Sequence, residues 1–338
     1  MIDVALDVPR YEGIINGALG QREKIERYAD ELHNKGFKNI FFIGVGGTYA
    51  HFTSLQSIVE SHSTLDSYVV IAAEFMAKGH KHFSKDSLCI MASRSGTTKE
   101  IIEAAKFCKE AGATVVMYTA NAGTPVCDLA DYLFVNFAED DNFAESFFLI
   151  YIPFMFRLMH HRGEFPRCGE FMDQVWKITP YLVEAKKKYD DRCRELAEKH
   201  KDTNYHMIVG SGNMWGQAYF YAMCIWEEMQ WIHGKAIHAA EFFHGTLELV
   251  EEGTSILMLY GEDETRPLMD RVLNFAKQFT KEIAIFDSKD IELPVDEEFR
   301  GFLSPIVVYA LTERFSIHLS KVRNHPLTTR RYYRRMDY

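Results

Sequence analysis

Short apolar runs rich in β-branched residues alternate with longer amphipathic stretches in the first half of this chain. Such alternation is typical of βαβ units around a parallel sheet. The stretch from Lys99 to Ala111 places Ile101, Ile102 and Ala105 on one apolar stripe, which predicts a helix. The five predicted buried strands are 39–44, 67–72, 87–92, 113–118 and 132–137. The sequence therefore predicts an α/β fold.

The same pattern recurs in the second half at a nearly constant offset. Phe42 in FIGVGG matches Ile208 in IVGSGN, 166 positions later. Three further pairs of matched segments start at positions 73 and 240, 87 and 254, and 113 and 281. Four landmarks in register indicate a tandem repeat, and 338 residues suffice for two domains. We expect two domains, 1–165 and 166–338, each a five-stranded parallel sheet flanked by helices, joined by a charged helical stretch over 171–200.

Composition narrows the class of protein. Lys plus Arg total 38 against 48 Asp plus Glu, a net charge of −10 that does not favour nucleic-acid binding. The six cysteines form no C-x-x-C pair, so we expect reduced thiols and neither a disulfide framework nor a zinc site. No signal peptide is expected at the N-terminus, and the most apolar stretch, 147–156, is too short for a membrane span. We expect a cytoplasmic protein.

Two loops at the predicted strand ends are candidates for binding phosphate. The first reads GVGGT over 44–48, and the second reads SRSGTT over 93–98. Hydroxyls and free backbone N–H groups at a helix N-terminus suit an anion, and parallel sheets bind ligands at this edge. The alternative is that these residues are only helix caps and turns. Neither a full G-x-G-x-x-G nor a G-K-[ST] motif is present, so a nucleotide is disfavoured. The candidates are Gly46, Gly47, Thr48, Ser93, Arg94, Ser95 and Thr98.

The matching loop of the second half differs in charge. It reads YGEDET over 260–265, and its acidic residues would repel an anion. Only the first half is therefore expected to bind phosphate.

Two carboxylates and a histidine stand among aromatic residues in the second half. They lie in WEEMQWIH, 226–233, and EFFHGT, 241–246. A carboxylate desolvated by aromatic neighbours suits a general base, and a histidine titrates near neutrality. Residue type alone leaves open that Glu227 or Glu228 is a solvated helix residue and that His244 is a hydrogen-bonded core residue.

The C-terminal segment NHPLTTRRYYRR, 324–335, is basic. In an otherwise acidic chain, we interpret it as a tail that folds over an anionic ligand or a partner subunit through guanidinium groups. The alternative is a solvated tail. A carboxylate on a ligand could pair with Arg330, Arg331 or Arg334.

These motifs resemble the double sugar isomerase (SIS) domain family, which binds phosphorylated sugars, and the likeness covers nearly the whole chain. The loops at 46–49 and 93–98 resemble its phosphate-binding loops. Glu228 and His244 match, at a spacing of 16, the base and the ring-opening histidine of the isomerase domain of glucosamine-6-phosphate synthase. By the same resemblance Tyr49, Glu241 and Arg331 are candidates for further substrate contacts.

The chain departs from that synthase in ways that bear on its chemistry. Ile225 and Arg331 replace two lysines, the second of which forms the Schiff base, and no glutaminase domain precedes the fold. The motifs look most like the deglycases of 6-phosphorylated Amadori products, in particular the fructose-aspartate branch. Thr246 stands where a proline is usual.

The resemblance implies cofactor-independent hydrolysis of a fructose-amino acid 6-phosphate to glucose 6-phosphate and an amine, with Glu228 as base and His244 as acid. It also implies a homodimer whose active sites are shared between subunits, with no nucleic-acid or membrane partner and no metal. An aldose–ketose or aminosugar isomerase or deaminase, a glucoselysine 6-phosphate deglycase and a non-catalytic sugar-phosphate sensor stay as alternatives. The amine on the sugar is left open.

Overall fold

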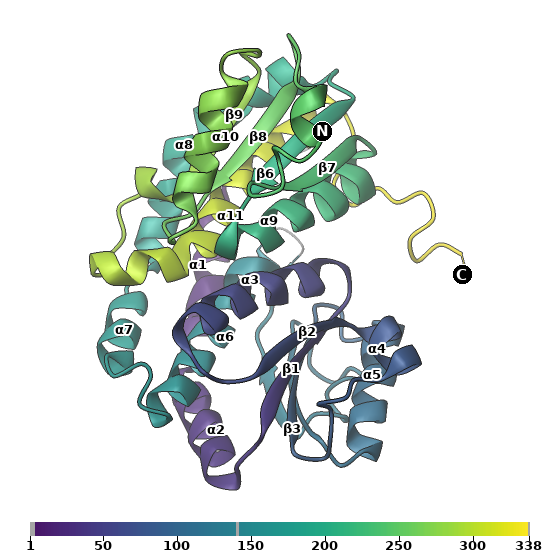
Figure 1. Ribbon diagram of the computed structural model, residues 1–338, viewed down its shortest axis with the longest axis vertical. Helices are drawn as coiled ribbons and strands as arrows, with labels where there is room; N and C mark the ends of the chain where they lie inside the picture. Colours follow the sequence, from purple (N-terminus) through teal and green to yellow (C-terminus); the bar gives the residue numbers. More distant parts are fainter. Residues whose placement is uncertain (1–3, 140–141, 337–338) are drawn as a thin grey trace. The chain divides into compact units, whose positions relative to one another are not determined.

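The computed structural model describes residues 4–139 and 142–336 (Figure 1). The chain forms two compact units. The N-terminal unit consists of residues 9–179 and 294–296, and the C-terminal unit of residues up to 8, 180–293 and from 297 onward. The segment before Pro9 thus belongs to the C-terminal unit, and residues 294–296 belong to the N-terminal unit.

A five-stranded parallel sheet forms the centre of the N-terminal unit, in the order β2-β1-β3-β4-β5. All five strands predicted from the sequence are confirmed. β1 and β3 consist entirely of buried residues, which explains their uninterrupted apolar sequences. The strands are β1 Asn39–Gly44, β2 Ser67–Ile71, β3 Ser87–Ser93, β4 Thr114–Thr119 and β5 Tyr132–Val135.

Helices cover both faces of this sheet (Figure 1). On one face Phe41 and Met91 pack with buried residues of α4 and α5, and on the other Phe42 stacks on Phe52 of α3. The hydroxyl of Tyr151 in α6 donates to the carbonyl of Met91 at 2.6 Å. The helices are α1 Val8–Leu19, α2 Arg22–Lys35, α3 Gly46–His62, α4 Ala72–Lys78, α5 Lys99–Glu110, α6 Phe143–His161 and α7 Cys168–Val175.

The sheet of the C-terminal unit is parallel and has four strands in the order β7-β6-β8-β9. This order repeats β2-β1-β3-β4. Residues 4–139 and 142–336 form no fifth strand in this sheet, so that expectation was wrong. A further parallel strand needs a crossover of about a dozen residues, whereas only residues 288–296 separate β9 from the next long helix. The strands are β6 Tyr205–Gly210, β7 His233–His238, β8 Ser255–Tyr260 and β9 Ile283–Asp287.

Helices also cover both faces of the second sheet. Residues of α10 pack with Met207 and Ile256 on one face, and Phe315 of α11 stacks on Phe286 on the other. The helical stretch predicted over 171–200 is two helices, α7 and α8, with a break at 176–178. The elements are α8 Thr179–His200, η1 Gly212–Met214, α9 Trp215–Phe220, the π-helical segment η2 Tyr221–Met229, η3 Thr246–Leu249, α10 Arg266–Ala276, η4 Ser288–Asp290 and α11 Glu297–Val322.

Within the described residues, no helix combines the length and the apolar character that a membrane crossing requires.

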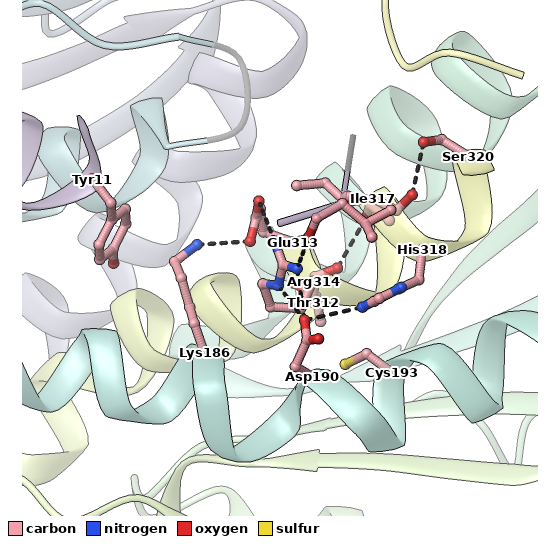
Figure 2. A network of polar contacts seen from close by, with 12 residues as sticks. Tyr11, Lys186, Asp190, Cys193, Thr312, Glu313, Arg314, Ile317, His318 and Ser320 are labelled. Atoms are coloured by element: carbon pink, nitrogen blue, oxygen red, sulfur yellow. Dashed lines mark hydrogen bonds and ion pairs between the residues drawn. The ribbon is translucent and has the colours of Figure 1, made fainter. Parts of the chain in front are cut away.

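A network of buried charges joins α8 to α11 within the C-terminal unit (Figure 2). Lys186 and Glu313 form an ion pair at 2.8 Å, with side chains only 1% and 6% exposed. One turn further along α8, Asp190 accepts hydrogen bonds from Arg314 at 2.8 Å and from His318 at 3.0 Å. Burial alone would raise the pKa of Asp190, but His318 and Arg314 outweigh it and hold this pKa below its usual value. The network fixes how the two helices pack.

Replacing Lys186 by Met should lower the free energy of unfolding by roughly 3 to 5 kcal/mol, because the buried Glu313 carboxylate loses its nearest cation and keeps only Arg314, at 3.9 Å. Urea unfolding followed by tryptophan fluorescence measures this, with Lys187→Met as the matched control on the exposed side of α8. The control should cost less than about 1 kcal/mol. Equal losses in the two variants would contradict a stabilising role for the buried ion pair of Lys186. The double variant Lys186→Met/Glu313→Gln should regain part of the stability.

Candidate active site

The two predicted phosphate loops follow neighbouring strands. β1 pairs with β3 up to Ile43 and Met91, so the loops after Gly44 and Ser93 leave the same edge of the sheet side by side. The chain runs outward in opposite directions from here, to β2 on one side and to β4 on the other. This is the topological switch point, at which open parallel sheets bind ligands.

The first loop turns directly into α3. A Cβ at Gly44 would lie 2.5 Å from the backbone nitrogen of Tyr49, so only glycine lets the helix start this close to the strand. The Val45 N–H donates to the Thr48 hydroxyl at 3.1 Å, and that hydroxyl donates to the Val45 carbonyl at 2.9 Å. Gly46 and Gly47 form the first turn of α3, whose N–H groups point toward the loop.

The second loop is held by its own hydroxyl groups. The buried Ser93 side chain accepts the Gly96 N–H at 3.1 Å and hydrogen-bonds the Thr98 hydroxyl at 2.9 Å. The Ser95 hydroxyl accepts the Thr97 N–H at 3.2 Å. Gly96 has φ +71°, and a Cβ there would lie 2.0 Å from Thr124 Oγ1. Each of these contacts shapes a turn that ends at Thr98, the residue before α5.

Residues that the sequence analysis missed support this loop from the adjacent strand. The carbonyl of Arg94, whose side chain is half-buried, accepts hydrogen bonds from Asn121 Nδ2 at 3.0 Å and from the Ala120 N–H at 3.1 Å. Both donors come directly after β4, the neighbour of β3. The sequence could have indicated these residues, because they directly follow a predicted strand next to the one that carries the loop.

The equivalent loops of the C-terminal unit hold a carboxylate of their own. Asp263 accepts the N–H of Asn213 at 2.8 Å, the N–H of Thr265 at 2.9 Å and the Thr265 hydroxyl at 2.5 Å. A Cβ at Gly212 would lie 2.5 Å from Asp263 Oδ2. The backbone donors that an external anion would use in this unit are therefore already engaged.

Glu228 lies in the π-helical segment η2, a geometry that is rare and concentrated at functional sites. Its carboxylate is 29% exposed and pairs with Arg330, whose Nε lies 2.8 Å from Glu228 Oε1. The neighbouring Glu227 is exposed to solvent, so burial does not restrict its side chain. Of the two carboxylates left open by the sequence, the structure singles out Glu228.

Arg330 belongs to a C-terminal tail, residues 323–336, that docks on the turn after η2. Gln230 Nε2 donates to the His325 carbonyl at 2.8 Å. The guanidinium of Arg331 stacks over Trp231, with Cζ 4.2 Å from the ring centroid. Trp231 itself has φ +56°, an uncommon conformation for a bulky residue. The tail therefore packs next to Glu228.

His244 and Glu241 are exposed and lie in the turn after β7, where the His244 N–H donates to the Glu241 carbonyl at 2.9 Å. This turn packs on the face of the sheet that α10 covers, where Lys235 Nζ approaches the Thr246 hydroxyl at 3.3 Å. η2 packs on the other face of β7: a Cβ at Gly234 would lie 3.2 Å from Ala222 and Trp226. Within one chain, strand β7 therefore stands between Glu228 and His244.

No group of three or more histidine, cysteine, aspartate or glutamate side chains suited to a metal ion occurs among residues 4–139 and 142–336.

Known proteins are similar to this chain in sequence and in fold. The SIS domain model matches residues 32–158. The chain is 30% identical over 321 residues to the fructosamine deglycase FrlB of Bacillus subtilis strain 168, covering 93% of this chain and 97% of that protein. It is 25% identical over 312 residues to the fructoselysine 6-phosphate deglycase of Escherichia coli O157:H7, covering 91% and 89%.

Solved structures agree on the fold. A candidate phosphosugar isomerase from B. subtilis superposes with a TM-score of 0.87 at 28% identity and covers 95% of this chain and 99% of its own. The C-terminal domain of glucosamine-fructose-6-phosphate aminotransferase from Francisella tularensis, at 16% identity, has a TM-score of 0.77, with 94% of each chain covered.

Two parallel sheets in tandem define a double-domain α/β protein with the architecture of phosphosugar isomerase structures. The chain belongs to the SIS family, within its group of sugar-phosphate deglycases and isomerases.

Replacing Gly96 by Ala should weaken binding of glucose 6-phosphate at least tenfold, because the new Cβ would collide with Thr124 and distort the loop over 93–98. Isothermal titration calorimetry measures the affinity. Gly36→Ala is the matched control, since Gly36 has φ +78° but open space around its Cβ position. Gly36→Ala should bind within twofold of the wild type, and unchanged affinity in Gly96→Ala would exclude this loop as the phosphate site.

Proposed function

We propose that this protein is a deglycase that hydrolyses a 6-phosphorylated Amadori product, a fructose-amino acid 6-phosphate, to glucose 6-phosphate and the free amino acid. The observation that carries the proposal is a half-buried carboxylate, Glu228, held at the end of a π-helical segment in a chain 30% identical to a fructosamine deglycase over nearly its full length. The expected substrate is the class of compound in which an amine is bonded to C1 of fructose 6-phosphate.

Glu228 is the general base in this reaction. It removes a proton from C1, and the electron pair of the C–H bond forms a C1=C2 double bond while the C2 carbonyl oxygen takes up a proton, giving an enaminol. The C1=C2 electron pair then takes up a proton at C2, which keeps its hydroxyl, while the electron pair on nitrogen forms a C1=N bond. Water adds to C1 of this C1=N bond and gives a carbinolamine. Its C1 oxygen loses a proton and forms the C1=O bond of glucose 6-phosphate, while the C1–N bond breaks with its electron pair going to nitrogen, which takes up a proton as the amine leaves.

His244 is the general acid, opening the sugar ring and later protonating the departing amine. An imidazole has two ring nitrogens, so it can both donate and accept a proton. The 6-phosphate is held by the loops at 46–48 and 93–98, whose hydroxyls and helix N-termini suit a dianion. Arg94 is the one cation within these loops.

The residues at two positions argue against amine transfer through a protein lysine. Ile225 is 7% exposed within η2, and Arg331 is stacked on Trp231, so neither offers a nucleophilic amine. An Amadori product already carries nitrogen on C1, and its conversion needs no Schiff base with the protein. The two replaced lysines therefore favour a deglycase over a transferase.

A homodimer with shared active sites accounts for the separation of the two catalytic residues. Glu228 and His244 lie on opposite faces of the edge strand β7 in one chain. A histidine donated by a second copy removes that obstacle. We therefore propose that each site combines Glu228 of one subunit with His244 of the other.

Replacing Glu228 by Gln should lower kcat for glucose 6-phosphate release by roughly 10²- to 10⁴-fold, because the amide cannot take the C1 proton. A coupled dehydrogenase assay with fructose-aspartate, fructose-glycine and fructoselysine 6-phosphates measures this, with Glu227→Gln as the matched control. The control should keep wild-type activity. Formation of fructose 6-phosphate in place of glucose 6-phosphate would indicate an isomerase or deaminase. Binding of the adducts without any turnover would indicate a sensor.

Mixing inactive Glu228→Gln and His244→Ala subunits should restore activity, because some mixed dimers hold one site with both native residues. Refolding an equimolar mixture should give about a quarter of the wild-type activity per subunit. This fraction follows from random pairing, in which half of the dimers are mixed and each has one intact site. No recovery in dimers shown by mass to be mixed would contradict the shared site.

A further inference from the structure

The guanidinium of Arg330 is held in a position that leaves its Nη2 group able to donate hydrogen bonds to a ligand. Its Nε pairs with Glu228 at 2.8 Å, and its Nη1 donates to the carbonyls of Leu327 at 2.6 Å and Thr329 at 2.9 Å. An arginine has five N–H donors, and Nη2 makes no hydrogen bond within the part of the chain that the structure describes. Nε and Nη2 lie along one edge of the guanidinium, the edge that binds a carboxylate through two parallel hydrogen bonds.

The covalent structure of the substrate places a second anion next to the base. A base that removes a proton from C1 must approach within about 3 to 3.5 Å of it. In an Amadori product of an α-amino group, the carboxylate carbon is three bonds from C1, a span of about 3.8 Å at most. A cation in contact with the base, as Arg330 is, therefore lies within reach of that carboxylate.

An adduct through the side-chain amine of lysine has a different geometry. Its carboxylate carbon is seven bonds from C1, on the far end of a flexible chain, and its nearest atoms are methylenes. An arginine beside the base would then face apolar groups while still attracting the base. The contact between Arg330 and Glu228 thus favours substrates that bear their carboxylate close to C1.

We propose that Arg330 is a specificity-determining residue that binds the α-carboxylate of the amino acid on C1 and releases Glu228 in exchange. This inference rests on the proposed deglycase function. Before substrate binds, Arg330 holds the Glu228 carboxylate in its ion pair. Once the substrate carboxylate takes the Nε–Nη2 edge, Arg330 no longer pairs with Glu228, and the Glu228 carboxylate turns to the C1 proton. The substrate class is then Amadori 6-phosphates of α-amino groups.

The test compares two substrates that differ only in this anion: the 6-phosphorylated fructose adducts of glycine and of glycinamide. The wild type should show a kcat/KM for the glycine adduct roughly tenfold to a hundredfold above that for the glycinamide adduct, as expected for hydrogen bonds to a charged group. Arg330→Met should bring the ratio close to one. Because the ratio is taken within one variant, a partial loss of folded protein cancels. Arg335→Met, an exposed arginine of the same tail, is the matched control and should keep the wild-type ratio.

Two results would overturn the proposal: an equal preference for the two adducts in the wild type, or an equal loss on both adducts in Arg330→Met. The second would leave Arg330 with a role only in positioning Glu228.

Equilibrium binding separates this proposal from the deglycase proposal itself. In Glu228→Gln the competing carboxylate is gone, so the glycine adduct should bind at least tenfold more tightly than the glycinamide adduct, by calorimetry and without turnover. Adding Arg330→Met should erase that difference. If no adduct is hydrolysed by the wild type but this difference in binding is present, the deglycase function fails and the carboxylate site of Arg330 stands. Equal binding of both adducts to Glu228→Gln would refute the site whatever the activity.

Discussion

Parallel strand pairing is the constraint on which the rest of this structure depends. Every parallel neighbour requires a crossover, so the chain must supply a helix between strands, and all carboxyl ends of the strands meet at one edge. The loops after β1 and β3 lie side by side for this reason alone, although 49 positions separate Gly44 from Ser93. The same constraint limits the second sheet to four strands, because the chain between β9 and α11 is too short for another crossover.

Much of this architecture could be predicted from the sequence because its signals are local. Buried parallel strands are uninterrupted apolar runs, and the two copies keep them at a fixed offset, so all five strands of the first sheet were placed correctly. The missing fifth strand of the second sheet was not foreseen, since it depends on connection length rather than on any residue. The break between α7 and α8 at 176–178 was also missed, because both flanking segments have helical periodicity.

Less of the candidate site than of the architecture could be predicted from the sequence. Residue types indicated candidate phosphate loops and left Glu227 and Glu228 open, and the family resemblance with its spacing of 16 to His244 favoured Glu228. Neither could choose one arginine of the tail over another. That choice depends on contacts between segments about a hundred residues apart, such as Arg330 with Glu228. The separation of Glu228 from His244 by β7 likewise follows from which face each segment covers, a property of packing that no local pattern encodes.

The equivalent loops of the two units differ in charge. In the C-terminal unit the carboxylate of Asp263 satisfies the donors of Asn213 and Thr265 permanently. The corresponding loop of the N-terminal unit, 93–98, carries no acidic residue, and in the proposed function it holds the phosphate of the substrate. Binding of a ligand to the folded state alone adds stability in proportion to the logarithm of its concentration. The proposed function would therefore link the stability of the N-terminal unit to the concentration of its sugar phosphate, whereas the C-terminal unit carries its own carboxylate at the equivalent loops.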